Sequence, residues 1–298
     1  DGDTVQGFGP FAVKEWINGE VITLIKNPHW VGNDAIPAPA LDEVNFDLAL
    51  DSSGGLANFE AGTMDVTGVP LPELDRLGAD ATLSQYLRIA PSDGVYYYGF
   101  NSSKAPTDDV RVRQALSMGF SRQSLIDNVL KGGQQPAFFF SNPNTLVAAP
   151  NANDYPDLVL GEDADAAQAL LAEYMADNGF ASASDVPAVI LMHNESENHA
   201  RIAQAIAGMW QDNLGIEVQI QTQEWGTYLD TVSSATADDT SPPVWRLGWG
   251  QDYPDANNYL FDVFHQSVSN YGLGWVSEGR DRFDAILDEA QVITDVAA

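Results

Sequence analysis

The sequence predicts an α/β protein in which sheets are flanked by helices. Helix and strand patterns alternate over residues 163–294, the order expected when crossover helices join neighbouring strands. Of the 298 residues, 44% are apolar, which is enough to build a sizeable core. Residues 1–92 differ from the rest because they combine short strands with short helices. We therefore expect two lobes, formed by residues 1–92 and 93–298.

The predicted elements of residues 1–92 are short. Asn18-Gly19 is a strong hairpin signal, because this dipeptide fits the tight turn between two antiparallel strands. The expected strands and helices of this part follow from alternation and from turn residues: strands at 12–16, 21–25, 44–50 and 65–69, and helices at 56–61 and 72–77.

From residue 93 onward, the helices carry clear start and stop signals. Ser196 is placed as the N-cap of a helix that ends at Leu214-Gly215, and Gly179 stops the helix before it. The remaining predicted elements are helices at 107–116, 121–131, 163–178, 225–232, 257–265 and 280–294, and strands at 95–101, 186–193, 216–220 and 244–249.

Composition excludes several classes of function. The net charge is −30, from 43 acidic and 13 basic residues, whereas a protein that binds a nucleic-acid backbone needs a basic face. There is no cysteine, so disulfides, thiol nucleophiles and Cys-type zinc sites are absent. No apolar run approaches the roughly 18 residues that indicate a membrane span. The scattered acidic residues are interpreted as a solvated surface.

The stretch 245–255 has the features of a site for an extended, polar ligand. Gly248 and Gly250 leave the backbone open to another chain, although an ordinary glycine bulge also explains them. Asp252 follows the strand end, where ligands of α/β sheets tend to lie. As an alternative, Asp252 caps the helix that starts after Pro254.

Ordered motifs along nearly the whole chain resemble those of the family 5 extracellular solute-binding proteins. Each motif is weak alone, and the ordered set is specific. The motifs are Gly7-Phe8-Gly9-Pro10-Phe11, Glu15-Trp16, Lys26-Asn27-Pro28, Leu41-Asp42-Glu43-Val44, Glu60-Ala61-Gly62-Thr63-Met64-Asp65-Val66, Tyr98-Gly99-Phe100-Asn101, Asp109-Val110-Arg111-Val112-Arg113-Gln114-Ala115-Leu116, Trp210 with Gly215-Ile216, Glu224-Trp225 with Leu229-Asp230, and Gly248-Trp249 with Asp252-Tyr253-Pro254-Asp255.

The resemblance implies a periplasmic-binding-protein-like fold of type II, with two lobes and mixed sheets flanked by helices. It implies a periplasmic or extracellular receptor that binds a short peptide and delivers it to the transmembrane subunits of an ABC permease, without a cofactor. The two lobes would close about a hinge near residues 91–101. Members of the family are much longer, so we expect the chain to be a fragment. Contact with a membrane is expected only through the permease or through a lipid anchor that this chain lacks.

The resemblance also implies roles for individual residues. A carboxylate at the position of Asp252 pairs with the α-ammonium of the peptide, and His199 lies near the C-terminal end of the ligand. Trp225 belongs to a matching Glu-Trp motif that lines the pocket, whereas Trp249 is either a pocket residue or a core residue.

Arg246 shares a strand face with Gly248 and precedes Asp252 by six residues. It is either the partner of the ligand's carboxylate or a residue paired with a carboxylate at the edge of the core.

Other functions remain as alternatives. Histidines and glutamates at 193–199 suggest a metal site, but Ser196 as an N-cap explains the acidic residues there, and His193 is expected to point away from His199. We therefore predict no metal. The same fold can bind an oligosaccharide or a metal chelate instead of a peptide. No Gly-x-Ser-x-Gly elbow, phosphate loop or zinc-protease helix is present, so an enzyme such as a hydrolase is not expected.

Overall fold

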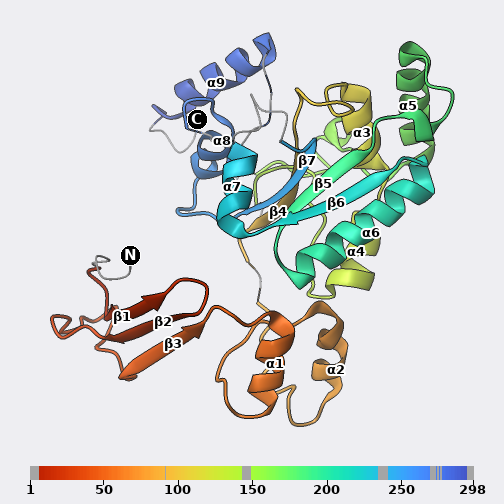
Figure 1. Ribbon diagram of the computed structural model, residues 1–298. Helices are drawn as coiled ribbons and strands as arrows, with labels where there is room; N and C mark the ends of the chain where they lie inside the picture. The colour runs from red at the N-terminus through yellow and green to blue at the C-terminus, as the bar shows by residue number, and fades with distance from the viewer. Residues whose placement is uncertain are drawn as a thin grey trace. The chain divides into compact units, whose positions relative to one another are not determined.

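The computed structural model describes residues 7–90, 92–142, 149–233, 241–268, 273, 275 and 277–293 (Figure 1). The chain divides into two compact units, Asp1–Pro70 and Leu71–Ala298. The short helices of residues 71–79 belong to the second unit because they pack on it: the N–H of Leu71 donates to Asn198 Oδ1 at 3.2 Å. The assignment of residues 1–92 and 93–298 to two lobes stays a prediction, and residue 91 of the expected hinge lies outside the described residues.

The first unit holds an antiparallel sheet in the order β1-β2-β3. The hairpin predicted at Asn18-Gly19 is confirmed. The elements are β1 (Phe11–Ile17), β2 (Val21–Lys26), β3 (Glu43–Asp47) and α1 (Ser52–Glu60). The strand predicted at 65–69 is wrong, because this segment is irregular and Val66 is 86% exposed. Alternation alone does not make a strand without a neighbouring strand to pair with.

A four-stranded mixed sheet is the centre of the second unit (Figure 1). Its order is β4-β7-β5-β6, in which β7, β5 and β6 are parallel and β4 is antiparallel to β7. The strands are β4 (Val95–Phe100), β5 (Val189–Asn194), β6 (Val218–Gln223) and β7 (Val244–Trp249). The predicted crossover order is therefore confirmed, and the strand 244–249 lies inside the sheet.

Helices surround this sheet, and the N-cap predicted at Ser196 is confirmed. Ser196, Asp163, Ser121 and Asp109 each accept a hydrogen bond from a backbone N–H in the first turn. The helices of the second unit are α2 (Leu74–Ala79), α3 (Val110–Met118), α4 (Arg122–Leu125) with the π-helical turn Ile126–Leu130, α5 (Ala164–Asn178), α6 (Glu197–Leu214), α7 (Trp225–Ser233), α8 (Ala256–Phe264) and α9 (Glu278–Ala290). Residue 294, where the last helix was predicted to end, lies outside the described residues.

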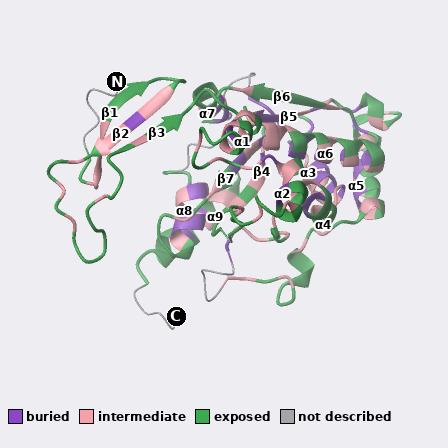
Figure 2. Cartoon of the chain, turned by 90° about the horizontal axis from the view of Figure 1, so that it is seen from below, coloured by how far each residue is buried: buried purple, intermediate pink, exposed green. Residues whose placement is uncertain are grey.

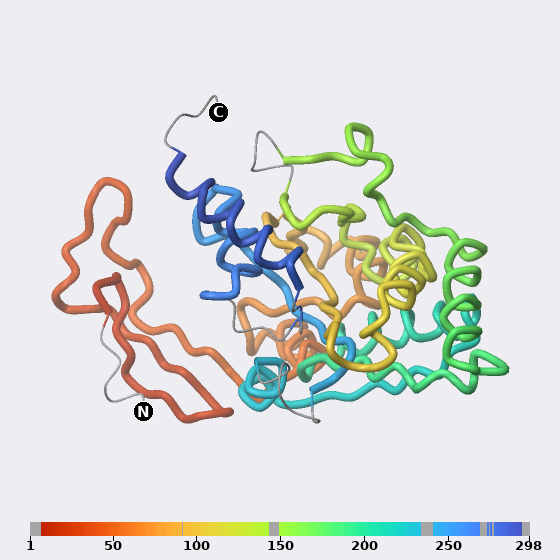
Figure 3. Tube along the Cα trace, turned by 90° about the horizontal axis from the view of Figure 1, so that it is seen from above, coloured from red at the N-terminus to blue at the C-terminus, as the bar shows by residue number. Residues whose placement is uncertain are grey.

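The two faces of the sheet are buried by different helices. Leu191 and Val244 pack with α3, α5 and α6, and Figure 2 shows buried segments gathered along β5 and these helices. Trp245 and Leu247 point to the other face and pack with α7. Alternation along β7 thus separates the two clusters. Helices α8 and α9 follow β7 and lie side by side (Figure 3). Within the described residues, no helix has the length and apolar character needed to cross a membrane.

The first prediction concerns Gly99, which lies opposite Trp245 in the β4–β7 pair. A Cβ atom at Gly99 would lie 2.4 Å from Cζ2 of the Trp245 ring. Gly99→Ala is therefore expected to lower the free energy of unfolding by about 1–3 kcal/mol, as measured by urea denaturation. Gly250→Ala is the control, because nothing lies within 4 Å of its added Cβ. Equal stability of the two variants would contradict the packing argument.

Candidate functional site

The end of β7 presents an open backbone edge. The strand pairs with β4 from Val244 to Trp249, but with β5 only at Val244 and Trp245. Beyond Trp245, the carbonyl of Arg246 accepts a hydrogen bond from the Tyr228 hydroxyl. Gly248 and Gly250 are exposed. The segment therefore carries backbone groups that have no strand partner among the described residues on the β5 side.

Arg246 lies on the same face as two tyrosines of β4. The register places Tyr98 opposite Arg246 and Tyr96 opposite Gly248. The guanidinium carbon lies 4.3 Å from the centroid of the Tyr96 ring, and Nη1 donates to Asn194 Oδ1 at 3.1 Å. A Cβ at Gly248 would lie 3.4 Å from Arg246 Nη2, so the glycine leaves room for the guanidinium.

The charge of Arg246 is not neutralised by any acidic side chain of the described residues. Its contacts there are a ring face, an amide oxygen and the neighbouring strand, and its Nε atom is buried without a hydrogen-bond partner. A buried guanidinium N–H without an acceptor is costly. An anionic ligand group would supply the missing acceptor.

His199 joins this cluster from the first turn of α6. Its Nδ1 lies 3.3 Å from the Tyr96 hydroxyl, and its ring centroid lies 6.4 Å from that of the buried His193. The expectation that His193 points away is therefore wrong. The reason is that α6 starts three residues after β5 ends, which brings both rings to one end of the sheet. Among the described residues, no group of three His, Asp or Glu side chains is arranged to hold a metal ion.

Burial controls the protonation of the cluster. Burial, together with the charges of Arg246 and His193, lowers the pKa of His199 to about 4. Burial also raises the pKa of Tyr96 and of Tyr98. At neutral pH, the imidazole and both phenols are therefore neutral, and Arg246 carries the positive charge of the cluster.

The two tryptophans differ in exposure. Trp225 is 47% exposed at the start of α7 and stacks on Tyr228, with ring centroids 6.2 Å apart. Glu224 caps this helix, because its Oε2 accepts from the N–H of Gly226 at 2.8 Å. Trp249 is half-buried, and its Nε1 is buried without a partner in the described chain. Trp225 is thus a surface residue rather than a core residue.

Asp252 lies in the loop between β7 and α8 and is exposed. The capping alternative for Asp252 is wrong, because Asp255 is the N-cap of α8 and accepts from Asn257 N–H at 2.8 Å. Asp252 is held by Asn258 instead: its N–H donates to Asn258 Oδ1 at 2.8 Å, and its Oδ2 accepts from Asn258 Nδ2 at 3.2 Å. Its carboxylate is therefore positioned but not neutralised by these contacts.

With this geometry in view, comparisons with known proteins identify the family. Residues 2–271 match the bacterial extracellular solute-binding proteins, family 5 middle.

The chain belongs to this family.

The relatives and solved structures that match this chain differ in the ligands that their names give. The oligopeptide-binding protein OppA of Bacillus subtilis is 31% identical over 295 residues, covering 99% of this chain and 52% of that protein. The probable deoxycholate-binding periplasmic protein YgiS of Escherichia coli is 33% identical over 288 residues, covering 96% and 50%. The structure of the E. coli murein tripeptide binding protein MppA matches with a TM-score of 0.76 at 29% identity, covering 97% and 53%.

These comparisons confirm the predicted type II periplasmic-binding-protein-like fold, with mixed sheets flanked by helices. The chain spans about half the length of the relatives that it matches. Within the described part, the candidate site residues Arg246 and His199 come together at one strand end, and Tyr96 lies between them.

Several residues of this candidate site are not predicted from the sequence. Tyr96 and Tyr98 lie opposite Gly248 and Arg246 because of the register between β4 and β7, which the sequence of neither strand specifies alone. Asn194 and Asn258 had no signal in the sequence, because a single amide has no spacing pattern.

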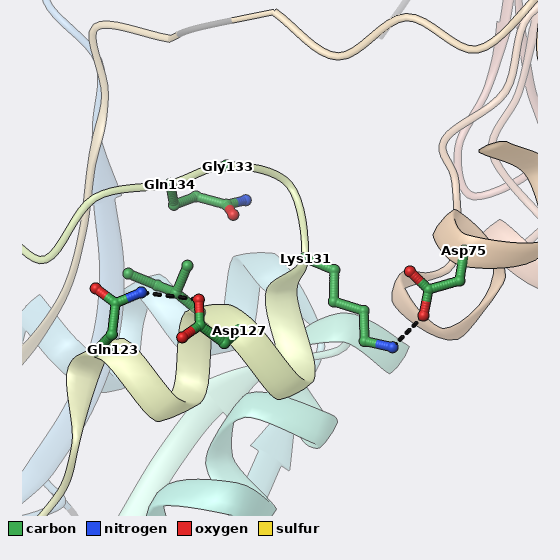
Figure 4. A pocket seen from close by; sticks show the side chains of 7 residues that line it. Asp75, Gln123, Asp127, Lys131, Gly133 and Gln134 are labelled. Carbon is green, nitrogen blue, oxygen red and sulfur yellow. Dashed lines mark hydrogen bonds and ion pairs between the residues drawn. The ribbon is translucent and has the colours of Figure 1, made fainter.

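A pocket elsewhere in the second unit contains none of the predicted site residues (Figure 4). It has a volume of about 440 Å³, and Lys131 forms an ion pair with Asp75 across it. Gln123 Nε2 also donates to Asp127 Oδ1 at 2.8 Å. Its polar groups are thus largely paired with one another, which favours a structural role.

The second prediction follows from the low pKa of His199. Because the unfolded chain binds a proton near pH 6.5 and the folded chain only near pH 4, stability falls as pH drops through this window. His199→Gln should remove this part of the pH dependence, as measured by urea denaturation at pH 7 and pH 4.5. Histidine ring NMR signals should give a midpoint near 4 for His199, and a midpoint at or above 6.5 would contradict the assignment.

Proposed function

We propose that the chain is part of an extracellular receptor of an ABC importer that binds short peptides in extended form. The observation that carries the proposal is the pair of charges along one open strand end, an unneutralised Arg246 and an exposed Asp252. A peptide has the complementary charges at its two termini. The oligopeptide and tripeptide receptors among the relatives support this ligand class.

Asp252 is the proposed partner of the peptide's α-ammonium. Asn258 donates to its Oδ2 and leaves the carboxylate charge uncompensated. A hydrogen bond between an ammonium and a carboxylate is among the stronger polar contacts in proteins. The amine end of the ligand would thus be fixed at the loop after β7.

Arg246 is the proposed partner of the carboxylate end. Its Nε has no acceptor, Tyr96 holds the guanidinium plane, and Asn194 fixes Nη1. The neutral His199 next to Tyr96 adds a polar ring that can donate to the same anion. An anion bound here would satisfy the unpaired donor, which is the energetic reason to bind it.

Gly248 and Gly250 are the proposed backbone template between the two charges. Strand addition gives affinity through main-chain hydrogen bonds, which do not depend on the ligand's side chains. Nothing lies within 4 Å of a Cβ built at Gly250, so the strand face above this glycine is open. Trp225 and Trp249 would border the ligand's side chains. Such a receptor accepts many sequences.

Delivery to the permease completes the proposal. The receptor would act in the periplasm or outside the cell, and the lobes would close on the peptide about the hinge near residues 91–101. Binding and closure are the whole reaction, and no covalent step is proposed. Family 5 comprises solute-binding proteins, which supports a function in binding rather than catalysis.

A second candidate ligand is an amphipathic organic acid that has no amine. The relative YgiS, a probable deoxycholate-binding protein, favours it, as do the exposed face of Trp225 and the unpaired Nε of Arg246. Such a ligand would use Arg246 for its carboxylate and the aromatic rings for its apolar body. It would not use Asp252.

The third prediction tests the peptide hypothesis. In the full-length protein, Asp252→Asn should weaken binding of free-amine peptides by about 10- to 100-fold, because a charged hydrogen bond is lost while the shape is kept. Isothermal calorimetry with oligo-alanines of two to five residues measures the change. Asp157→Asn is the control, because Asp157 is an exposed carboxylate in the short 3-10 helix Pro156–Leu158, outside the candidate site. Equal affinity of wild type and Asp252→Asn would remove Asp252 from the site.

The fourth prediction separates the two ligand classes. For a peptide, both Asp252→Asn and Arg246→Gln should weaken binding, because each removes one charge partner. For an organic acid, Arg246→Gln should weaken binding of sodium deoxycholate, and Asp252→Asn should leave it unchanged. Calorimetry on the two variants with both ligands decides between them. Wild-type binding of deoxycholate without binding of any oligo-alanine would replace the peptide hypothesis by the second candidate.

A further inference from the structure

Asn258 is a fully buried polar residue in the first turn of α8, directly beneath the loop that carries Asp252. A buried amide is stable only when its donors and its acceptor are satisfied. All three are satisfied here, and two of the three bonds go to Asp252. Asn258 therefore connects the position of one exposed carboxylate to the core of the second unit.

The orientation of the Asn258 amide is fixed by its partners. Its Oδ1 accepts from the N–H of Asp252 at 2.8 Å, and its Nδ2 donates to Asp252 Oδ2 at 3.2 Å and to Asp262 Oδ2 at 2.8 Å. A flipped amide would place its carbonyl oxygen against two carboxylates and its NH₂ against an N–H. Only one orientation of the amide is compatible with these neighbours. In that orientation, Asn258 holds both the backbone N–H and the side-chain carboxylate of Asp252.

Asp262 secures this arrangement from the next turn of α8. Its Oδ2 accepts from Asn258 Nδ2 and, at 3.3 Å, from the hydroxyl of Tyr253. The carboxylates of Asp252 and Asp262 thus both accept from the NH₂ group of Asn258. Neither makes an ion pair with a basic side chain of the described residues. Their combined negative potential favours a cationic group at Asp252 over a neutral one.

We propose that Asn258 is the positioning residue for Asp252, and that Asp262 sets the preference of this end of the site for a charged amine. The proposal rests on the proposed function, in which Asp252 binds the ligand's α-ammonium. Asn258 itself touches no ligand: it orients the carboxylate and holds the loop at the end of β7. Asp262 supplies the second negative charge and fixes the Asn258 amide.

The experiment compares two ligands that differ only at the amine. In the full-length protein, calorimetry measures the affinity for oligo-alanines of two to five residues with a free or an N-acetylated terminus. The ratio of the two affinities is the readout. In Asn258→Leu the ratio should fall by about tenfold, because the carboxylate loses the contact that orients it. The affinity for the acetylated peptides should stay unchanged.

Asn257→Leu is the matched control on the same turn. Asn257 donates to the hydroxyl of Tyr253 at 2.8 Å and makes no hydrogen bond with Asp252, so the free-to-acetylated ratio should remain that of the wild type. A proportional fall of both affinities in Asn258→Leu would mean a merely structural role and would overturn the inference. An unchanged ratio would overturn it as well.

A second variant covers the case in which Asn258→Leu does not fold. Asp262→Asn keeps an acceptor for Asn258 Nδ2 and removes one negative charge. It should lower the free-to-acetylated ratio while leaving the acetylated affinity unchanged, and an unchanged ratio would contradict the role of Asp262. A wild-type protein that binds both peptide forms equally, or neither, would overturn the proposed function itself rather than the role of Asn258.

Discussion

The contact between Trp245 and the bare Cα of Gly99 is the packing constraint on which the strand end depends. The indole occupies the space that a side chain at Gly99 would fill, so β4 and β7 fit together in one register. A slip by one residue would turn every side chain to the opposite face. That register places Tyr96 and Tyr98 beside Gly248 and Arg246. Apolar packing on one face of the sheet thereby arranges the polar cluster on the other.

Electrostatics then give this cluster its positive charge. The chain carries a net charge of −30, so a guanidinium has many carboxylates available, yet Arg246 meets a tyrosine ring and an amide oxygen instead. These contacts hold the group without neutralising it. Burial keeps His199 and Tyr96 neutral, so the positive charge of the cluster is that of the Arg246 guanidinium. An anionic ligand group is the simplest complement to that charge.

The sequence predicts features that depend on neighbours along the chain and misses those that depend on packing. Ser196 is predictable as a cap, because a cap bonds to residues two or three positions away. The meeting of His193 with His199 depends on how α6 turns over the sheet, and the bond from Asn258 to Asp252 depends on α8. No local pattern encodes either contact. The strand predicted at 65–69 fails for the same reason, since alternation does not supply a partner strand.

Arg246 and Asp252, the two charged groups of the proposed site, are held by different means. Arg246 belongs to a strand that pairs with β4 along its whole length and with β5 at Val244 and Trp245, whereas Asp252 belongs to a loop held by one buried amide. Six residues separate them, which limits their spacing to roughly 20 Å at an extended rise of about 3.3 Å per residue. In the proposed receptor, this spacing would restrict ligand length, while the open backbone of Gly248 and Gly250 would restrict the ligand's conformation. Neither restriction involves the ligand's side chains, so the proposed site would select by length and terminal charge.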